Sequence, residues 1–162
     1  MNGGMELYLH MPFCVRKCAY CDFLSFPTDQ ETQNLYTRRL REDIDAMGKK
    51  YGDIPVDTIF IGGGTPSVPD SALIVGIMEH VRKAFHVAEG AEISMEANPG
   101  TVTREKLTDY RRAGINRLSF GLQSANDREL KLLGRIHTWA EFLESFHLAR
   151  ECGFTNINID LM

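Results

Sequence analysis

Two spacings of apolar residues alternate along the chain. Short, nearly continuous apolar runs are typical of strands that are buried on both faces of a parallel sheet. The longer segments between them place apolar residues at every third or fourth position, which predicts helices with one buried face. The pattern therefore predicts strands at Glu6 to Met11, Val56 to Ile61, Glu92 to Ala97, Arg117 to Gly121 and Asn156 to Leu161.

Start and stop signals predict the helices between these strands. Three helices are expected to open on a Ser or Thr that precedes an acidic residue by three positions: Thr28 with Glu31, Ser124 with Asp127, and Thr138 with Glu141. One helix is expected from about Pro69, another from Thr103 to a stop at Gly114, and Gly153 ends the last. Their apolar faces comprise Tyr36, Leu40, Ile44 and Met47; Leu73, Ile77, Val81 and Phe85; Leu130 and Leu133; and Phe142, Phe146, Ala149 and Cys152.

The alternation of strand and helix predicts an α/β fold with a parallel sheet and right-handed crossovers. A doubly wound sheet and an α/β barrel fit this pattern equally. In an α/β barrel, the active site is built at the carboxyl ends of the strands. Distinctive polar or glycine residues occupy all of these ends, so we expect one shared mouth formed by the cysteine loop, the run Gly62 to Gly64, Glu96, Gln123 and Asp160.

Three of the four cysteines lie on one short segment, at the spacing Cys14-x-x-x-Cys18-x-x-Cys21. Three thiolates on a loop can hold three irons of a cubane cluster and leave the fourth iron open for a ligand. A structural zinc site normally takes four ligands in paired clusters, and here only His10 is near as a fourth. A disulfide would leave one of the three thiols unpaired, and nothing suggests secretion.

Composition and charge exclude several classes of protein. The chain has 162 residues, of which 43% are hydrophobic and 25% charged, which suits one globular domain. No apolar run is long enough for a transmembrane segment, and the start lacks the pattern of a signal peptide, so we expect a cytoplasmic protein with reduced cysteines. A net charge of −4 with dispersed basic residues argues against nucleic acid as a partner.

The wider sequence resembles a known family. The segment YLHMPFCVRKCAYCDF, followed in order by IGGGTPS, EANPGT, RLSFGLQS and LLGRIHT, is similar to the radical S-adenosylmethionine (SAM) superfamily. Within it, the motifs resemble the branch of oxygen-independent coproporphyrinogen III dehydrogenases and heme chaperones. The resemblance implies a partial (β/α) barrel, with residues 1–162 forming its N-terminal part after about five strands. The chain stops inside an expected strand, so we expect the remaining barrel and a C-terminal domain to be absent.

The resemblance also implies cofactors and their contacts. A [4Fe-4S] cluster would be held by Cys14, Cys18 and Cys21, and SAM would chelate the open iron. One-electron reduction would then cleave SAM to methionine and a 5′-deoxyadenosyl radical. The residues that match SAM contacts or positions beside the cluster are Tyr8, Tyr20, Gly63, Gly64, Thr65, Glu96, Gln123, Arg135 and Asp160.

Several of these residues also have a purely structural interpretation. The glycine run either lets the backbone approach a ligand or forms a plain strand-to-helix turn. His10 and His137 are expected to make structural hydrogen bonds, with proton donation to a substrate as the alternative. Cys152 lies on an apolar helix face, which indicates a small buried residue and not a fourth ligand. Three other histidines are interpreted as solvated or packing residues: His80, His86 and His147.

Phe23 separates the two activities of the branch. The dehydrogenases carry an additional cysteine at this position, so Phe23 favours a heme chaperone over a coproporphyrinogen III dehydrogenase. A radical SAM enzyme with another substrate is a third possibility. The implied partners are heme or a porphyrinogen, an electron donor such as flavodoxin or ferredoxin, and a heme-acceptor protein, with the heme site outside this chain.

Overall fold

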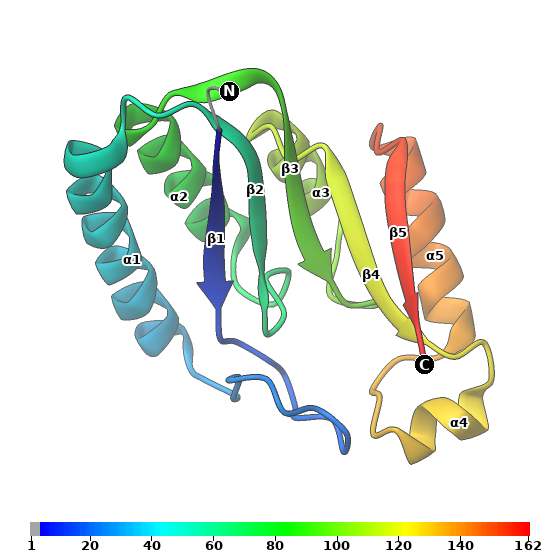
Figure 1. Ribbon diagram of the computed structural model, residues 1–162. Coiled ribbons are helices and arrows are strands. Elements are labelled where there is room, and N and C mark those ends of the chain that lie inside the picture. Colours follow the sequence, from blue (N-terminus) through cyan, green and yellow to red (C-terminus); the bar gives the residue numbers. More distant parts are fainter. Residues whose placement is uncertain (1–3) are drawn as a thin grey trace.

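The computed structural model describes residues 4–162 and shows a parallel sheet with its helices on one side (Figure 1). The five strands follow each other in the sheet in chain order, β1-β2-β3-β4-β5, and every pair is parallel. All of the predicted strands and helices are present. The strands are β1 (Met5–Met11), β2 (Val56–Gly63), β3 (Val87–Ala97), β4 (Arg117–Gln123) and β5 (Asn156–Leu161). The helices are α1 (Gln30–Tyr51), α2 (Ser71–Ala84), α3 (Arg104–Arg112), α4 (Asp127–Leu132) and α5 (Trp139–Glu151).

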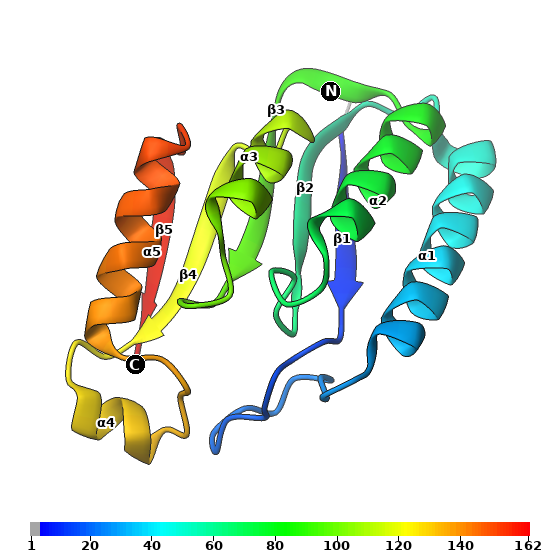
Figure 2. The same ribbon diagram turned by 180° about the vertical axis from the view of Figure 1, so that it is seen from behind.

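The arrangement of the layers decides between the two predicted α/β folds. Figure 2 shows α1, α2, α3 and α5 packed against the same face of the sheet. A doubly wound sheet would carry helices on both faces and reverse its strand order. The sequential order and the single helical layer are those of a barrel. Within residues 4–162, β1 and β5 are not paired, so the sheet is a partial barrel, as expected.

The hydrophobic core lies between the sheet and the helices. In the central strands, residues that point to the helices are fully buried, among them Ile59, Ile61, Met95 and Phe120. The opposite, concave face is different, because it carries polar side chains. The strand register sets these side chains in rows across the sheet, such as Glu96 beside Ser119 and Ser119 beside Asn158. This polar face is available for a ligand.

The structure corrects several details of the helices. The N-cap of α1 is Asp29, whose side chain accepts a hydrogen bond from Thr32 N, and not Thr28. The N-cap of α4 is Asn126, and Ser124 instead accepts from Asn126 N. Both predicted caps were wrong because Asp and Asn, also strong N-caps, stand closer to the first helical turn.

The buried faces of α1 and α2 also differ from the predicted ones. Met47 on α1 is 51% exposed, so its place in the apolar stripe was wrong. On α2, Leu73 is only half-buried, while Ile74 and Met78 are fully buried beside Ile77. The predicted period was correct, and the face that packs on the sheet is rotated by about one residue.

Two helix boundaries follow the predicted signals. The capping box of α5 is formed by Thr138 and Glu141, each side chain bonding to the other's backbone N–H. Gly114 and Gly153 follow α3 and α5 with φ angles of 88° and 89°, which glycine adopts without a Cβ clash. In the part of the chain that the structure describes, no helix has both the length and the apolar character that crossing a membrane requires.

Candidate functional site

The three clustered cysteines lie on a loop, residues 12–29, that is closed at its base. Phe13 pairs with Phe26 in an isolated β-bridge, and Cys14 N donates to Phe26 O at 3.2 Å. Phe13 is buried and packs edge-on against Tyr36 of α1, with ring centroids 5.3 Å apart. These contacts fix both ends of the loop against the core, so the cysteines project from a rigid base.

The far side of the loop is held by the segment that follows α4. Ala19 N donates to Leu133 O at 3.1 Å, and the Arg16 guanidinium donates to Gly134 O at 2.7 Å. His10 bonds the loop to β1, because its Nε2 lies 2.9 Å from Leu24 O. This is the structural hydrogen bond expected of His10. The loop is therefore attached to β1 on one side and to the α4 region on the other.

Each glycine of the run Gly62 to Gly64, at the end of β2, avoids a different clash. A Cβ on Gly62 would lie 2.5 Å from the Phe60 ring, and one on Gly63 would lie 2.3 Å from His10. Gly63 also has a φ angle of 108°, a conformation that favours glycine. A Cβ on Gly64 would lie 2.6 Å from Met11 O, because this backbone docks directly on the cysteine loop. The run therefore has a packing role that the sequence did not indicate, in addition to lining the pocket.

One pocket at the carboxyl ends of the strands collects the predicted site residues. Its wall includes Cys14, Cys18, Tyr20, Cys21, Gly63, Gly64, Thr65, Glu96, Gln123, Arg135 and Asp160. Of the predicted residues, Tyr8 and Gly62 are outside the wall. The expectation that the strand ends share one mouth is thus confirmed for these residues.

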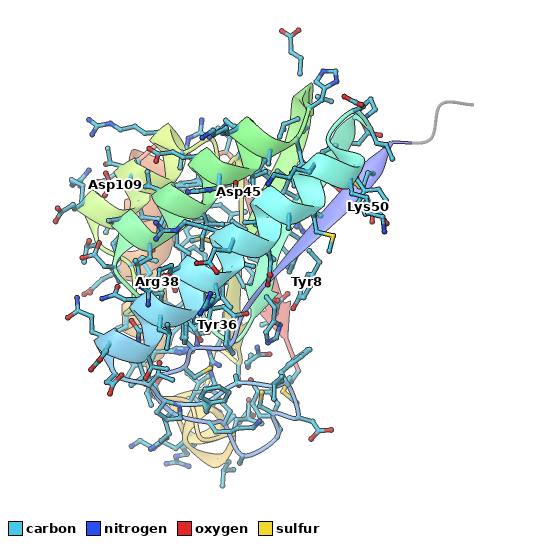
Figure 3. The ribbon with its side chains drawn as sticks, turned by 90° about the vertical axis from the view of Figure 1, so that its left-hand side faces the viewer. Tyr8, Tyr36, Arg38, Asp45, Lys50 and Asp109 are labelled. Carbon is cyan, nitrogen blue, oxygen red and sulfur yellow. The ribbon has the colours of Figure 1, made fainter. Side chains whose placement is uncertain are left out.

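Tyr8 lies one row further from the mouth, on the concave face of β1. Figure 3 shows it on the opposite side of β1 from Tyr36. Its hydroxyl lies 3.1 Å from His10 Nδ1, and its ring stacks on Phe60 with centroids 6.1 Å apart. Tyr8 is 57% exposed, so it is placed beside the pocket and available to a ligand larger than the pocket itself.

Glu96 is a half-buried carboxylate in the wall of the pocket. Its Oε2 accepts a hydrogen bond from Gly63 N at 2.8 Å. Burial raises the pKa of Glu96 above its ordinary value, the Gly63 hydrogen bond opposes this rise, and nearby Asp160 adds to it. A cationic ligand group next to Glu96 would therefore be favourable, because it would compensate the buried negative charge of the carboxylate.

Asp160 and Gln123 close the opposite side of the pocket. The Asp160 carboxylate accepts from Ser119 Oγ at 3.1 Å and from Asn158 Nδ2 at 2.7 Å. Gln123 has a φ angle of 73°, in the left-handed region that residues other than glycine seldom adopt. Such strained residues cluster at functional sites, and this one re-aims a polar side chain at the end of β4.

Arg135 provides the cationic side of the pocket. One guanidinium nitrogen donates to Cys18 Sγ at 3.5 Å, and the other donates to Asn98 Oδ1 at 2.7 Å and Gly121 O at 2.5 Å. Tyr20 lines the same pocket. Burial raises the pKa of its hydroxyl, and the charge of Arg135 opposes that rise. The segment after α4 thus contributes directly to the cysteine site.

The three loop thiols line the same pocket. All four cysteines are free, and the three on the loop are half-buried. Within residues 4–162, no three His, Cys, Asp or Glu side chains lie close enough together to hold one metal ion. A cubane cluster distributes its thiolate ligands over separate irons, so its ligands need to share a pocket and not a single centre.

Two buried polar atoms on the pocket residues have no hydrogen-bond partner in the described part of the chain. They are the Oγ of Ser25, a residue that is 4% exposed, and the Nε of Arg135. Buried donors without a partner are unfavourable, so these atoms indicate where a bound group would be satisfied. The sequence did not single out Ser25.

Three further residues of the site were missed from the sequence: Asn98, Ser119 and Ser25. Asn98 directly follows β3, where asparagine is common as a turn residue without any binding role. Ser119 faces the concave side by strand alternation, a signal that was present but was not used. Nothing in the sequence alone distinguishes Ser25 from an ordinary loop serine.

The remaining histidines and Cys152 lie outside the pocket. His137 is 4% exposed, and its Nε2 donates to Leu122 O at 3.2 Å, which matches the structural role expected of it. Cys152 caps the end of α5 and packs partly against the core. His80 pairs with Asp45 between α2 and α1, in keeping with a packing role.

Comparisons with known proteins agree with this geometry. The heme chaperone HemW of Escherichia coli is 43% identical over 98% of this chain and 42% of its own length. HemW of Haemophilus influenzae is 40% identical, over 98% of this chain and 43% of its own. The solved structure of the E. coli coproporphyrinogen III oxidase HemN, described as a radical SAM enzyme, superposes with a TM-score of 0.90 and 32% identity. The superposition covers 99% of this chain and 38% of the HemN chain.

The relatives fix the extent of the match. The chain spans about two fifths of the length of the curated relatives it matches. The family model described as the radical SAM superfamily matches residues 8–162, which include the cysteine loop and every strand end that forms the pocket. This chain therefore belongs to the radical SAM superfamily.

Proposed function

We propose that this chain is the cofactor-binding part of a heme chaperone. The observation that supports the proposal is the single pocket that the three loop cysteines share with Glu96, Arg135 and Asp160. Heme itself would bind outside residues 1–162, in a C-terminal domain beyond the remaining strands of the barrel. The alternative is an oxygen-independent coproporphyrinogen III dehydrogenase.

Membership of the superfamily implies a [4Fe-4S] cluster and SAM as cofactors. The residues present fit both groups, because free thiols and two unpartnered buried donors line the same cavity. Cys14, Cys18 and Cys21 would hold three irons, and the fourth would remain open to SAM. When bound, the two cofactors supply one-electron reductive chemistry, while the protein supplies binding and orientation.

Charge complementarity assigns the parts of SAM to this chain's residues. SAM carries a sulfonium, an ammonium and a carboxylate group. Glu96 would accept hydrogen bonds from the ammonium, and Asp160 and Gln123 would accept from hydroxyls of the ribose. Arg135 retains free N–H groups for the carboxylate, since three of its donor positions are used by protein acceptors. Tyr20 would lie beside the adenine.

Phe23 favours the chaperone over the dehydrogenase. It lines the pocket and is 65% exposed, so a side chain at this position faces the ligand space. A cysteine there would present a thiol to a substrate, whereas phenylalanine has no group that transfers a proton or hydrogen. The relatives named as heme chaperones, at up to 43% identity, support the same choice.

The other partners follow from the surface around the cluster loop. Arg16 and Lys17 are exposed next to the cysteines, and a basic rim suits an acidic electron donor such as flavodoxin or ferredoxin. A heme-acceptor protein would be the final partner. Free cysteines of this kind persist in the reducing cytoplasm, where we place the protein.

Iron analysis tests the cluster ligands. The full-length protein that contains these residues, reconstituted without oxygen, is expected to hold about four irons per cluster site, and Cys18→Ala is expected to lose the cluster. Cys152→Ala is the matched control, because this thiol lies outside the pocket, and it should retain full iron. A complete cluster in Cys18→Ala, or one zinc per chain without iron, would refute the assignment.

A paired assay tests chaperone against dehydrogenase. With cluster, SAM and a strong reductant, the full-length protein is expected to leave coproporphyrinogen III unconverted, as measured by chromatography. Heme titration should instead give about one bound heme per chain and a shifted Soret band. Turnover well above a cluster-free control, without stable heme binding, would favour the dehydrogenase.

A further inference from the structure

A chain of hydrogen bonds joins two of the loop cysteines through residues on three other segments. Arg135 donates to Cys18 Sγ at 3.5 Å and to Asn98 Oδ1 at 2.7 Å. Asn98 Nδ2 donates to Thr65 Oγ1 at 2.9 Å, and Thr65 Oγ1 lies 3.5 Å from Cys14 Sγ. Asn98 is therefore the central member of a relay between Cys14 and Cys18.

The chemistry of the groups fixes the direction of every bond in this relay. A guanidinium only donates, so the amide oxygen of Asn98 must face Arg135 and the amide nitrogen must face Thr65. The Thr65 hydroxyl accepts from that nitrogen, which leaves its own hydrogen for Cys14. A thiolate only accepts, so the last bond runs from Thr65 to sulfur.

The surroundings of the relay hold it in place. Thr65 is 2% exposed, so its hydroxyl has little access to water as an alternative partner. A Cβ on Gly121 would lie 3.0 Å from Asn98 Oδ1 and 3.2 Å from the Arg135 guanidinium, so this strand position leaves room for their contact. Ser67 Oγ accepts from Asn98 N at 3.2 Å, which anchors the backbone of Asn98.

We propose that Asn98 is a positioning residue that directs two hydrogen bonds onto the cluster thiolates and thereby raises the reduction potential of the cluster. This inference rests on the proposed function, since it requires Cys14 and Cys18 to be cluster ligands. Hydrogen bonds to the ligating sulfurs stabilise the more negative, reduced cluster, and their loss makes reduction harder. One guanidinium acts on Cys18 directly and on Cys14 through Asn98 and Thr65, and bonds in such a chain polarise one another.

The test is the midpoint potential of the cluster in the full-length protein without SAM, measured by redox titration followed by electron paramagnetic resonance. Asn98→Ala and Thr65→Val are each expected to shift the potential to more negative values. Thr65→Ser keeps the hydroxyl, so its midpoint potential should stay close to that of the unsubstituted protein. In the double variant the shift should be smaller than the sum of the two single shifts, because Thr65→Val removes the hydrogen bond to Cys14 and Asn98→Ala removes the donor that orients it.

Separate outcomes identify which idea fails. If the unsubstituted protein assembles no cluster, the proposed function fails. If the cluster assembles but Asn98→Ala and Thr65→Val leave its potential unchanged, or the two shifts add fully, the relay is refuted and the proposed function is not. If Asn98→Ala loses iron, the midpoint potentials of Thr65→Val and Thr65→Ser are compared instead. We expect a more negative potential for Thr65→Val, and equal potentials would overturn the proposal.

Discussion

Single side chains in and near the pocket have their charge states set by burial more than by their neighbours. Burial is the largest cause of the raised pKa of Glu96 and of the lowered pKa of His137. The two residues titrate in opposite senses, because burial disfavours a carboxylate in one case and an imidazolium in the other. Each therefore predicts its own dependence of stability on pH.

Glu96→Gln is expected to separate stability from ligand binding. The raised pKa means that the stability contributed by Glu96 is complete below the pKa of an unfolded glutamate and is lost as pH rises through the folded value. A permanently neutral Gln can still accept from Gly63 N. The variant should melt at a temperature equal to or above that of the unsubstituted protein at pH 7, with the difference vanishing in acid.

The same variant should bind SAM more weakly. A charge-assisted hydrogen bond contributes about 1.5 to 3 kcal/mol, so affinity measured by calorimetry should fall by about tenfold or more. A lower melting temperature at pH 7 would show that the charge of Glu96 stabilises the fold, contrary to the burial argument.

His137 is expected to cause a loss of stability in mild acid. Burial lowers its pKa from an ordinary 6.5 to about 4, so the neutral ring is favoured in the folded state. The stability from this group is complete above pH 6.5 and is lost as pH falls towards 4, by about 3 kcal/mol in all. His137→Gln, which can still donate to Leu122 O, should flatten this part of the curve of unfolding free energy against pH. An unchanged slope would contradict the assignment.

At the scale of elements, the contact between the β2 glycine run and the cysteine loop positions the site. Gly64 N donates to Met11 O at 2.8 Å, and Thr65 N donates to Phe13 O at 2.6 Å. These two bonds hold the turn after β2 against the segment that follows β1. They also bring the Thr65 side chain to Cys14.

Gly64→Ala should disrupt this contact. Its Cβ would meet backbone atoms of Met11 and Phe13 at 2.6 to 2.8 Å, and backbone cannot move aside as a flexible side chain can. We expect a loss of roughly 1 to 3 kcal/mol in denaturant unfolding, together with poorer cluster retention. Gly76→Ala on α2 is the matched control, because its Cβ meets only the flexible Arg41 guanidinium, at 3.2 Å, and it improves helix propensity. Equal free energies of unfolding for Gly64→Ala and Gly76→Ala would contradict the expectation that a Cβ at position 64 clashes with the backbone.

At the scale of the whole molecule, the open sheet has an exposed edge. On β5, Leu161 is 67% exposed and Ile159 is 38% exposed. An apolar edge strand with free backbone groups is a template for pairing with another chain. A ligand would bind on the concave polar face, and another strand would pair with the β5 edge.

A polypeptide of residues 1–162 alone is therefore expected to self-associate at micromolar concentration. Light scattering after size-exclusion chromatography measures the mass, and replacing both Ile159 and Leu161 by lysine should reduce association, since edge lysines oppose strand pairing. A monodisperse monomer that melts cooperatively without these substitutions would contradict the expectation.

The sequence by itself determined the elements, the cysteine loop and the shared mouth of the pocket. These depend on local periodicity and on the rule that parallel strands end at one edge, so Glu96, Gln123 and Asp160 could be placed together without coordinates. The strand and helix pattern left the barrel and the doubly wound sheet equally possible; the family resemblance implied the barrel, and the single helical layer confirms it. Tertiary structure alone decided the position of Tyr8 beside the pocket and the role of Asn98. Those depend on which face the helices cover and on distances between side chains far apart in the chain, which no local pattern encodes.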